Sequence, residues 1–188
     1  MTDLKSLDPE TRCFALVGQF LHAWSTMELC LHDAIGDAVR VRPLMRFILC
    51  ANLQIRNKLN ILNSIVDVSS LKDTERKHYS NLLNDLSQYS AARNMMAHDP
   101  FAPDETESDP AKQGVTFGPV KAKGKFSLPP TTWNQDKFRE EIEKVAEYAD
   151  ALIRLRDKLR TTKFDHKRAT RLVTILSRMP NDSTLCIS

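Results

Sequence analysis

The sequence predicts an all-α protein, an antiparallel four-helix bundle, on the basis of three observations. Gly is scarce, with five in 188 residues, and aromatic residues make up only 7%. Residue types that favour helices dominate most of the length, namely Leu, Ala, Lys, Glu and Arg. Long stretches also place apolar residues at alternating steps of three and four, the spacing of a helix face that packs into a core. With 41% hydrophobic and 27% charged residues, we expect a single domain over 1–188.

The first helix is predicted to begin at Asp8, whose carboxylate can cap it, with Pro9 at the first helical position. Its apolar seam runs from Phe14 to Ala38, and one position on that seam, Glu28, is charged. A carboxylate among core side chains needs a cation or several hydrogen-bond donors. The sequence therefore predicts a polar partner for Glu28 on a neighbouring helix.

A second, continuous helix is predicted from Pro43 to about Val66, because Pro43 suits a first turn and one apolar seam extends along this stretch. Asn52 interrupts the seam, and residues 56–58 are expected on the flank of the helix. A short break at Ser69 and Ser70 then leads into the third helix.

The third helix is predicted to begin at the potential cap Asp73 and to end at His98, because Asp99 and Pro100 stop it. Its seam turns polar in the second half, at Ser90 and Arg93. The full predicted seam is Tyr79, Leu83, Leu86, Ser90, Arg93 and Ala97.

An insertion over about 99–130 separates the third and fourth helices. Residues 99–113 are rich in Pro, Asp and Glu and predict a surface loop, whereas 115–128 alternate in a way that predicts a short β-hairpin. The fourth helix is expected to run to about Arg160. A short basic C-terminal helix and tail complete the chain over about 163–188.

Arg93, Asn94 and His98 form the candidate catalytic group at the end of the third helix, with Ser90 and Glu28 as supporting residues. His can exchange protons near neutral pH, and the planar donors of Arg match a phosphate. This pair suits cleavage of RNA by attack of a 2′-hydroxyl on the adjacent phosphorus. The chemistry requires no metal, and the sequence contains no metal-ligand spacing, so we expect no metal and no cofactor.

Basic residues are also concentrated near the C-terminus, where nine Lys or Arg lie between 154 and 178 against two Asp. Such a surface can bind RNA phosphates by Coulomb attraction, although a solvated helix face explains the same charges. The candidate RNA-binding residues are Arg154, Lys158, Arg160, Lys167, Arg168 and Arg171.

The segment Arg93-Asn94-Met95-Met96-Ala97-His98 resembles the R-x4-6-H signature of the HEPN superfamily, in which a polar residue commonly follows the Arg. The order of helices over about 8–160 is similar to that family at the level of pattern. The resemblance implies a homodimeric helical bundle with two motifs facing one cleft. In active members it implies a metal-independent endoribonuclease of toxin–antitoxin or phage-defence systems, with a nucleotidyltransferase-type antitoxin as a possible partner.

Two alternatives stay open on the sequence. Arg93 and Glu28 are both charges at seam positions, so they could form a buried ion pair with each other. The chain could also be a catalytically inactive helical module that binds RNA or a protein partner, as many relatives in that family are. No stretch reaches the roughly 20 apolar residues of a membrane span, and the N-terminus lacks an apolar signal region, so we expect a cytoplasmic protein.

Overall fold

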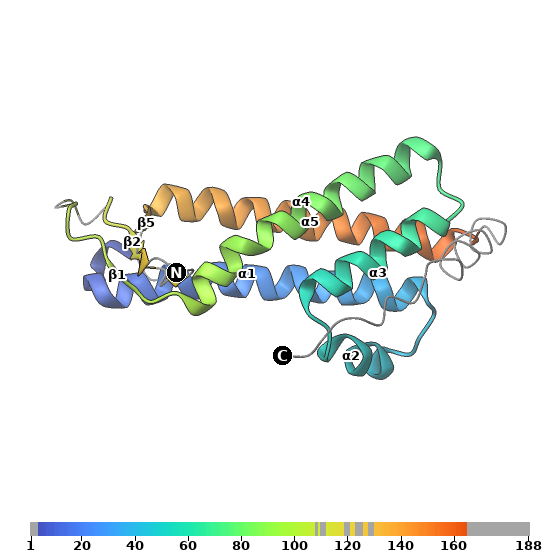
Figure 1. Cartoon of the computed structure of the whole chain (residues 1–188), viewed down its shortest axis with the longest axis horizontal. Helices are drawn as coiled ribbons and strands as arrows, with labels where there is room; N and C mark the ends of the chain where they lie inside the picture. The colour runs from blue at the N-terminus through green and yellow to red at the C-terminus, as the bar shows by residue number, and fades with distance from the viewer. Residues whose placement is uncertain are drawn as a thin grey trace.

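A computed structural model describes residues 4–107, 109, 112–118, 121–122, 126–127 and 130–164 (Figure 1). The chain is mainly helical and carries a small three-stranded antiparallel sheet, which confirms the predicted α class. The predicted C-terminal helix lies outside the described residues, which end at Phe164. None of the described helices is both long and apolar enough to cross a membrane. The helices are η1 Leu4–Ser6 (3₁₀), α1 Pro9–Ala38, α2 Pro43–Ala51, α3 Ile55–Val68, α4 Asp73–His98 and α5 Gln135–Thr161.

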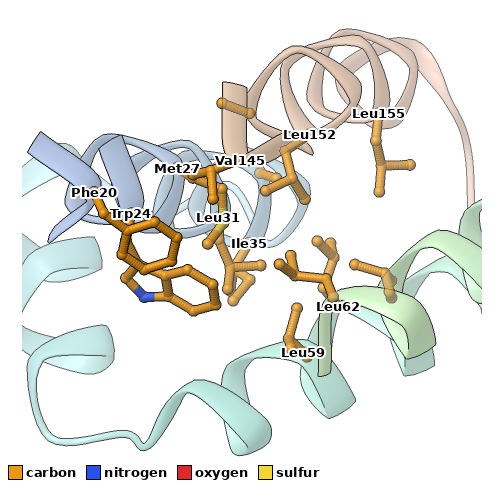
Figure 2. Close-up of a cluster of buried hydrophobic side chains, with 14 of the residues drawn as sticks. Phe20, Trp24, Met27, Leu31, Ile35, Leu59, Leu62, Val145, Leu152 and Leu155 are labelled. Atoms are coloured by element: carbon orange, nitrogen blue, oxygen red, sulfur yellow. The ribbon is translucent and has the colours of Figure 1, made fainter. Parts of the chain in front are cut away.

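Helix α1 begins where the sequence predicts. The Oδ1 atom of Asp8 accepts a hydrogen bond from the amide of Thr11 at 2.9 Å, and Pro9 occupies the first turn. Its inward face supplies large side chains to the core, against Val145, Leu152 and Leu155 of α5 (Figure 2). The fully buried side chains of α1 include Phe20, Trp24, Met27 and Leu31.

The four long helices, α1, α3, α4 and α5, do not alternate in direction as an antiparallel four-helix bundle requires (Figure 1). The ring of Phe20, in the first half of α1, lies 5.9 Å from the ring of Trp133, which comes just before α5. Near the ends of these two helices, Arg160 Nε of α5 lies 3.7 Å from Asp37 Oδ2 of α1. Helices α1 and α5 therefore run parallel, and Figure 1 shows α3 running the same way while α4 runs against them. The prediction of an antiparallel four-helix arrangement was wrong, because α2 takes the chain back after α1.

The predicted second helix is two helices. Helix α2 ends at Ala51, with Asn52 as its C-terminal cap residue, and α3 begins at Ile55 after an extended Gln54. Asn52, the polar residue that interrupts the predicted seam, marks the break. The change of direction lets α3 pack against both α1 and α4.

The insertion forms more β structure than the sequence predicts. Strand β2 (Val115–Phe117) is central in the three-stranded sheet, between β1 (Phe101–Pro103) and β5 (Thr131–Trp133). The predicted hairpin is confirmed only for its short inner pair, β3 (Lys121–Ala122) with β4 (Phe126–Ser127). Strand β1 falls in the predicted loop. Its pairing is explained by aromatic packing across the sheet, since the rings of the cross-strand partners Phe101 and Phe117 lie 5.9 Å apart.

The sheet fixes the end of α4. Only Asp99 and Pro100 separate His98 from strand β1. Asp99 is extended, and its amide donates to the Met95 carbonyl at 3.0 Å, while the amide of Gly118 donates to the Pro100 carbonyl at 3.0 Å. These two hydrogen bonds therefore fix the residues that join the final turn of α4 to the sheet.

Candidate active site

The final turn of α4 borders a cleft of about 500 Å³. Its other walls come from the middle of α1, from the connection between α2 and α3, and from the first turn of α3. The three residues predicted as catalytic all line this cleft. The complete lining is Trp24, Glu28, Ala51, Leu53, Gln54, Ile55, Lys58, Arg93, Asn94 and His98.

Arg93 contacts both of the other predicted catalytic residues. Its Nη1 atom donates to Asn94 Oδ1 at 3.3 Å and lies 3.4 Å from His98 Nε2. A guanidinium has donors only, so a hydrogen bond in this contact requires a His98 Nε2 atom that carries no hydrogen. The geometry therefore places the His98 imidazole beside the fixed positive charge of Arg93.

Helix geometry accounts for this arrangement. Residues five apart are about 140° apart around a helix, so Arg93 reaches His98 through the length of its side chain. Met96, on the opposite side of the turn from Asn94 and His98, is 2% exposed and anchors it in the core. Arg93 is half-buried, whereas Asn94 and His98 are exposed.

Two further positions of the predicted seam do not contribute to the cleft. The hydroxyl of Ser90 donates to the carbonyl of Ser87 at 2.6 Å, a bond within its own helix, and Ser90 is not among the residues that line the cleft. Ala97 is exposed, contrary to the prediction that it packs inward. The inward position in this turn belongs to Met96 instead.

Glu28 pairs with Lys58 and not with Arg93. Lys58 Nζ lies 2.5 Å from Glu28 Oε1, and His32 Nε2 lies 3.8 Å from the same oxygen. The side chain of Lys58 is only 5% exposed, so this residue faces inward and not outward on a flank as predicted. Arg93 is absent from the ion pairs found among the described residues, and its guanidinium contacts Asn94 and His98 instead.

His32 lies next to this ion pair, one turn along α1 from Glu28. Burial of the ring, together with the nearby charge of Lys58, lowers the pKa of His32 below its ordinary value. Neither ring nitrogen has a hydrogen-bond partner among the residues that the structure describes. On this side of the cleft the charges are those of Lys58 and Glu28, and the lowered pKa favours the neutral form of His32.

Sequence reasoning missed Trp24, Gln54 and Lys58 as parts of the cleft. Trp24 falls on the predicted apolar seam from Phe14 to Ala38, Lys58 falls on the predicted flank, and Gln54 lies inside the predicted continuous helix. The polar break at Asn52 was the available signal, because a helix boundary there turns residues 54–58 toward α1. The seam position of Glu28 was the second signal, since it required a cation nearby.

The predicted RNA-binding residues do not converge on this cleft. Arg154, Lys158 and Arg160 lie near the C-terminal end of α5, on the half of the molecule away from the end of α4 (Figure 1). Lys158 Nζ is 2.5 Å from Glu75 Oε1, and Arg160 pairs with Asp37. Lys167, Arg168 and Arg171 lie outside the described residues.

Within the described ranges, no group of three or more His, Cys, Asp or Glu side chains is placed to hold a metal ion. The chain matches no known protein-family model, and comparisons with curated proteins and with solved structures find no match. The geometry of the cleft is therefore the basis for the functional argument.

Proposed function

We propose that the protein is a metal-independent endoribonuclease that cleaves RNA at the Arg93–His98 cleft. The observation that carries the proposal is the contact between the Arg93 guanidinium and His98 Nε2 inside a cleft of about 500 Å³. The resemblance of this segment to the R-x4-6-H signature of HEPN ribonucleases supports the same chemistry. A role as a toxin or phage-defence effector, with a nucleotidyltransferase-type antitoxin, belongs to this proposal.

The contact supplies a general base. In the free cleft, the lone pair of His98 Nε2 accepts from Arg93. A phosphate that enters the cleft offers charged acceptors to Arg93, and the charge-assisted bond replaces the weaker one to the imidazole. His98 Nε2 is then free to accept the proton of the ribose 2′-hydroxyl.

The reaction is a transfer at phosphorus that needs no external reagent. The 2′-oxygen forms a bond to phosphorus as its proton passes to His98, and the bond from phosphorus to the 5′-oxygen breaks. The leaving 5′-oxygen takes a proton from the donor that the second motif of a dimer would supply, which gives a 2′,3′-cyclic phosphate and a 5′-hydroxyl. Arg93 stabilises the charge that develops on the phosphoryl oxygens, and Asn94 holds Arg93 in position through its amide oxygen.

A homodimer would bring a second motif to the cleft and supply the proton donor for the leaving oxygen. Helix α2 supports this part of the proposal, because most of its apolar side chains are exposed, Leu44 to 71%. A patch of this kind on a soluble protein marks an interaction surface. Ala51, the last residue of α2, lines the cleft, so a copy docked on α2 would lie beside the motif. The exposed residues are Leu44, Met45, Phe47, Ile48 and Leu49.

The dimer can be tested by mass in solution. Leu44 and Ile48 share one face of α2, so the double variant Leu44→Glu/Ile48→Glu should convert a dimer to a monomer in light scattering after gel filtration. Phe14→Glu is the matched control, an exposed apolar residue at the far end of α1. A wild-type protein that is monomeric at all concentrations would contradict the composite cleft.

The nuclease proposal is tested by RNA cleavage in the presence of EDTA. Arg93→Gln and His98→Ala should each reduce the rate roughly 100-fold or more, the usual scale for loss of a phosphate-stabilising donor or a general base. His78→Ala is the control, an exposed histidine on the same helix. Absence of cleavage by the wild type, with RNA or protein binding retained, would favour the alternative of a catalytically inactive binding module.

A further inference from the structure

Trp24 presents an unusual hydrogen-bond donor to the cleft. The residue is 2% exposed and packs between the rings of Phe20 and Tyr89, at 6.5 and 6.1 Å between ring centroids. Its indole Nε1 atom is buried and has no hydrogen-bond partner among the described residues, although Trp24 forms part of the cleft wall. In Figure 2 the indole lies at the edge of the apolar cluster, with its nitrogen on the side away from Leu59.

A buried, unpaired N–H is costly, and the great majority of such groups in folded proteins are paired. The hydroxyl of the neighbouring Tyr89 donates to the carboxylate of Glu141, and it forms no hydrogen bond with Trp24 Nε1. An acceptor that enters the cleft would recover the lost hydrogen bond. The indole N–H of Trp24 is therefore an unpaired donor on a residue of the cleft wall.

The chemistry of the surrounding wall indicates what that acceptor is. Leu53 and Ile55 are apolar, and Gln54 can both donate and accept. The cation next to these residues is Lys58, and its charge is matched by Glu28 at 2.5 Å. A wall with little net charge suits a flat, neutral group better than a second phosphate.

We propose that the wall formed by Trp24, Leu53, Gln54 and Ile55 binds the base of a nucleotide next to the cleaved phosphate, and that Trp24 Nε1 donates to a carbonyl oxygen of that base. This inference rests on the proposed function in taking RNA as the ligand. Bases of single-stranded RNA are recognised by hydrogen bonds to their edges and by apolar contact. Uracil, guanine and cytosine carry a carbonyl oxygen, whereas adenine has none, so the site discriminates against adenine by leaving Trp24 unpaired.

Binding of short oligonucleotides tests the inference without requiring cleavage. Oligouridylate and oligoadenylate with 2′-O-methyl riboses lack the attacking hydroxyl and remain intact. Trp24→Phe keeps an aromatic ring but removes the N–H, so it should weaken binding of the oligouridylate about fivefold to tenfold and of the oligoadenylate less than twofold. Trp133→Phe is the control, since Trp133 belongs to strand β5, contacts Phe117 of β2 and does not line the cleft. Equal loss for both oligonucleotides, or no loss, would overturn the inference.

A second measurement follows the wild-type protein, and the variants serve only to assign its signals. The chain has two tryptophans, so its nitrogen–hydrogen correlation spectrum has two indole signals, which the two variants assign. The Trp24 signal should shift on addition of the oligouridylate while that of Trp133 stays in place. An unmoved Trp24 signal in a protein that cleaves RNA overturns the inference alone. A shifted signal without cleavage overturns only the nuclease proposal, and no binding of either oligonucleotide overturns both.

Discussion

Replacing Glu28 by Gln removes the negative charge from the ion pair below the cleft and leaves Lys58 charged in a site where its side chain is only 5% exposed. Removal of one partner from a fully buried pair costs about 3–5 kcal/mol. Glu28 itself is 24% exposed, so water from the cleft reaches the site and reduces this cost. We expect Glu28→Gln to lower the free energy of unfolding by about 2–3 kcal/mol, or roughly 5–10 °C in Tm for a chain of this size.

The partner substitution is expected to be milder. Lys58→Met fills a similar volume with apolar atoms and leaves the more exposed carboxylate of Glu28, so we expect a loss of about 1 kcal/mol. The double variant Glu28→Gln/Lys58→Met leaves no unpaired charge and should be close to the wild type. Arg93→Gln should also change stability little, because Arg93 contacts Asn94 and His98 and not Glu28.

Urea unfolding of the four variants measures these differences directly. Two outcomes would refute the reasoning. One is a double variant as unstable as Glu28→Gln alone, which would show that the pair is not the cause of the loss. The other is an Arg93→Gln variant as unstable as Glu28→Gln, which would place Arg93 in the role assigned to Lys58.

Two further predictions concern the sheet and pH. A Cβ atom at Gly114 would meet the backbone of Trp133, so Gly114→Ala should destabilise the protein by about 2 kcal/mol in urea unfolding. Gly118→Ala is the control and should be nearly neutral, because Gly118 has open space around it. Equal effects of the two substitutions would contradict the packing of β2 against β5. Burial lowers the pKa of His32 from its ordinary 6.5. Below that pH the unfolded chain therefore binds a proton that the folded chain does not. The free energy of unfolding should fall as pH decreases. His32→Gln should reduce this loss in unfolding midpoints measured at several pH values, and an unchanged pH dependence would argue against a neutral, buried ring.

The elements that sequence analysis located correctly are those set by local chemistry. The start of α1 follows from the Asp8 cap and Pro9, and the end of α4 follows from Asp99 and Pro100, since proline and capping side chains act within one turn. The convergence of Arg93 and His98 was predictable for the same reason, because five residues of helix and one long side chain determine it.

The features that sequence analysis missed depend on contacts between distant segments. The partner of Glu28 is Lys58 because α3 starts afresh after Asn52, and apolar periodicity continues across that break without revealing it. The parallel course of α1 and α5 follows from the reversal made by α2, which no local pattern encodes. Trp24 reads as a core residue in the sequence, and only the structure shows that its N–H is unpaired at a cleft.

Analysis of the ends of cleaved RNA tests the central claim most directly. The protein is incubated with an end-labelled RNA in EDTA, beside His98→Ala and beside an RNA with one deoxyribose at the preferred cleavage position. Attack by the 2′-hydroxyl predicts products that end in a 2′,3′-cyclic phosphate, no cut at the deoxyribose, and little or no product from His98→Ala. Products with 3′-hydroxyl ends, or equal cleavage by the wild type and His98→Ala, would contradict the assignment of the Arg93–His98 cleft as a ribonuclease site.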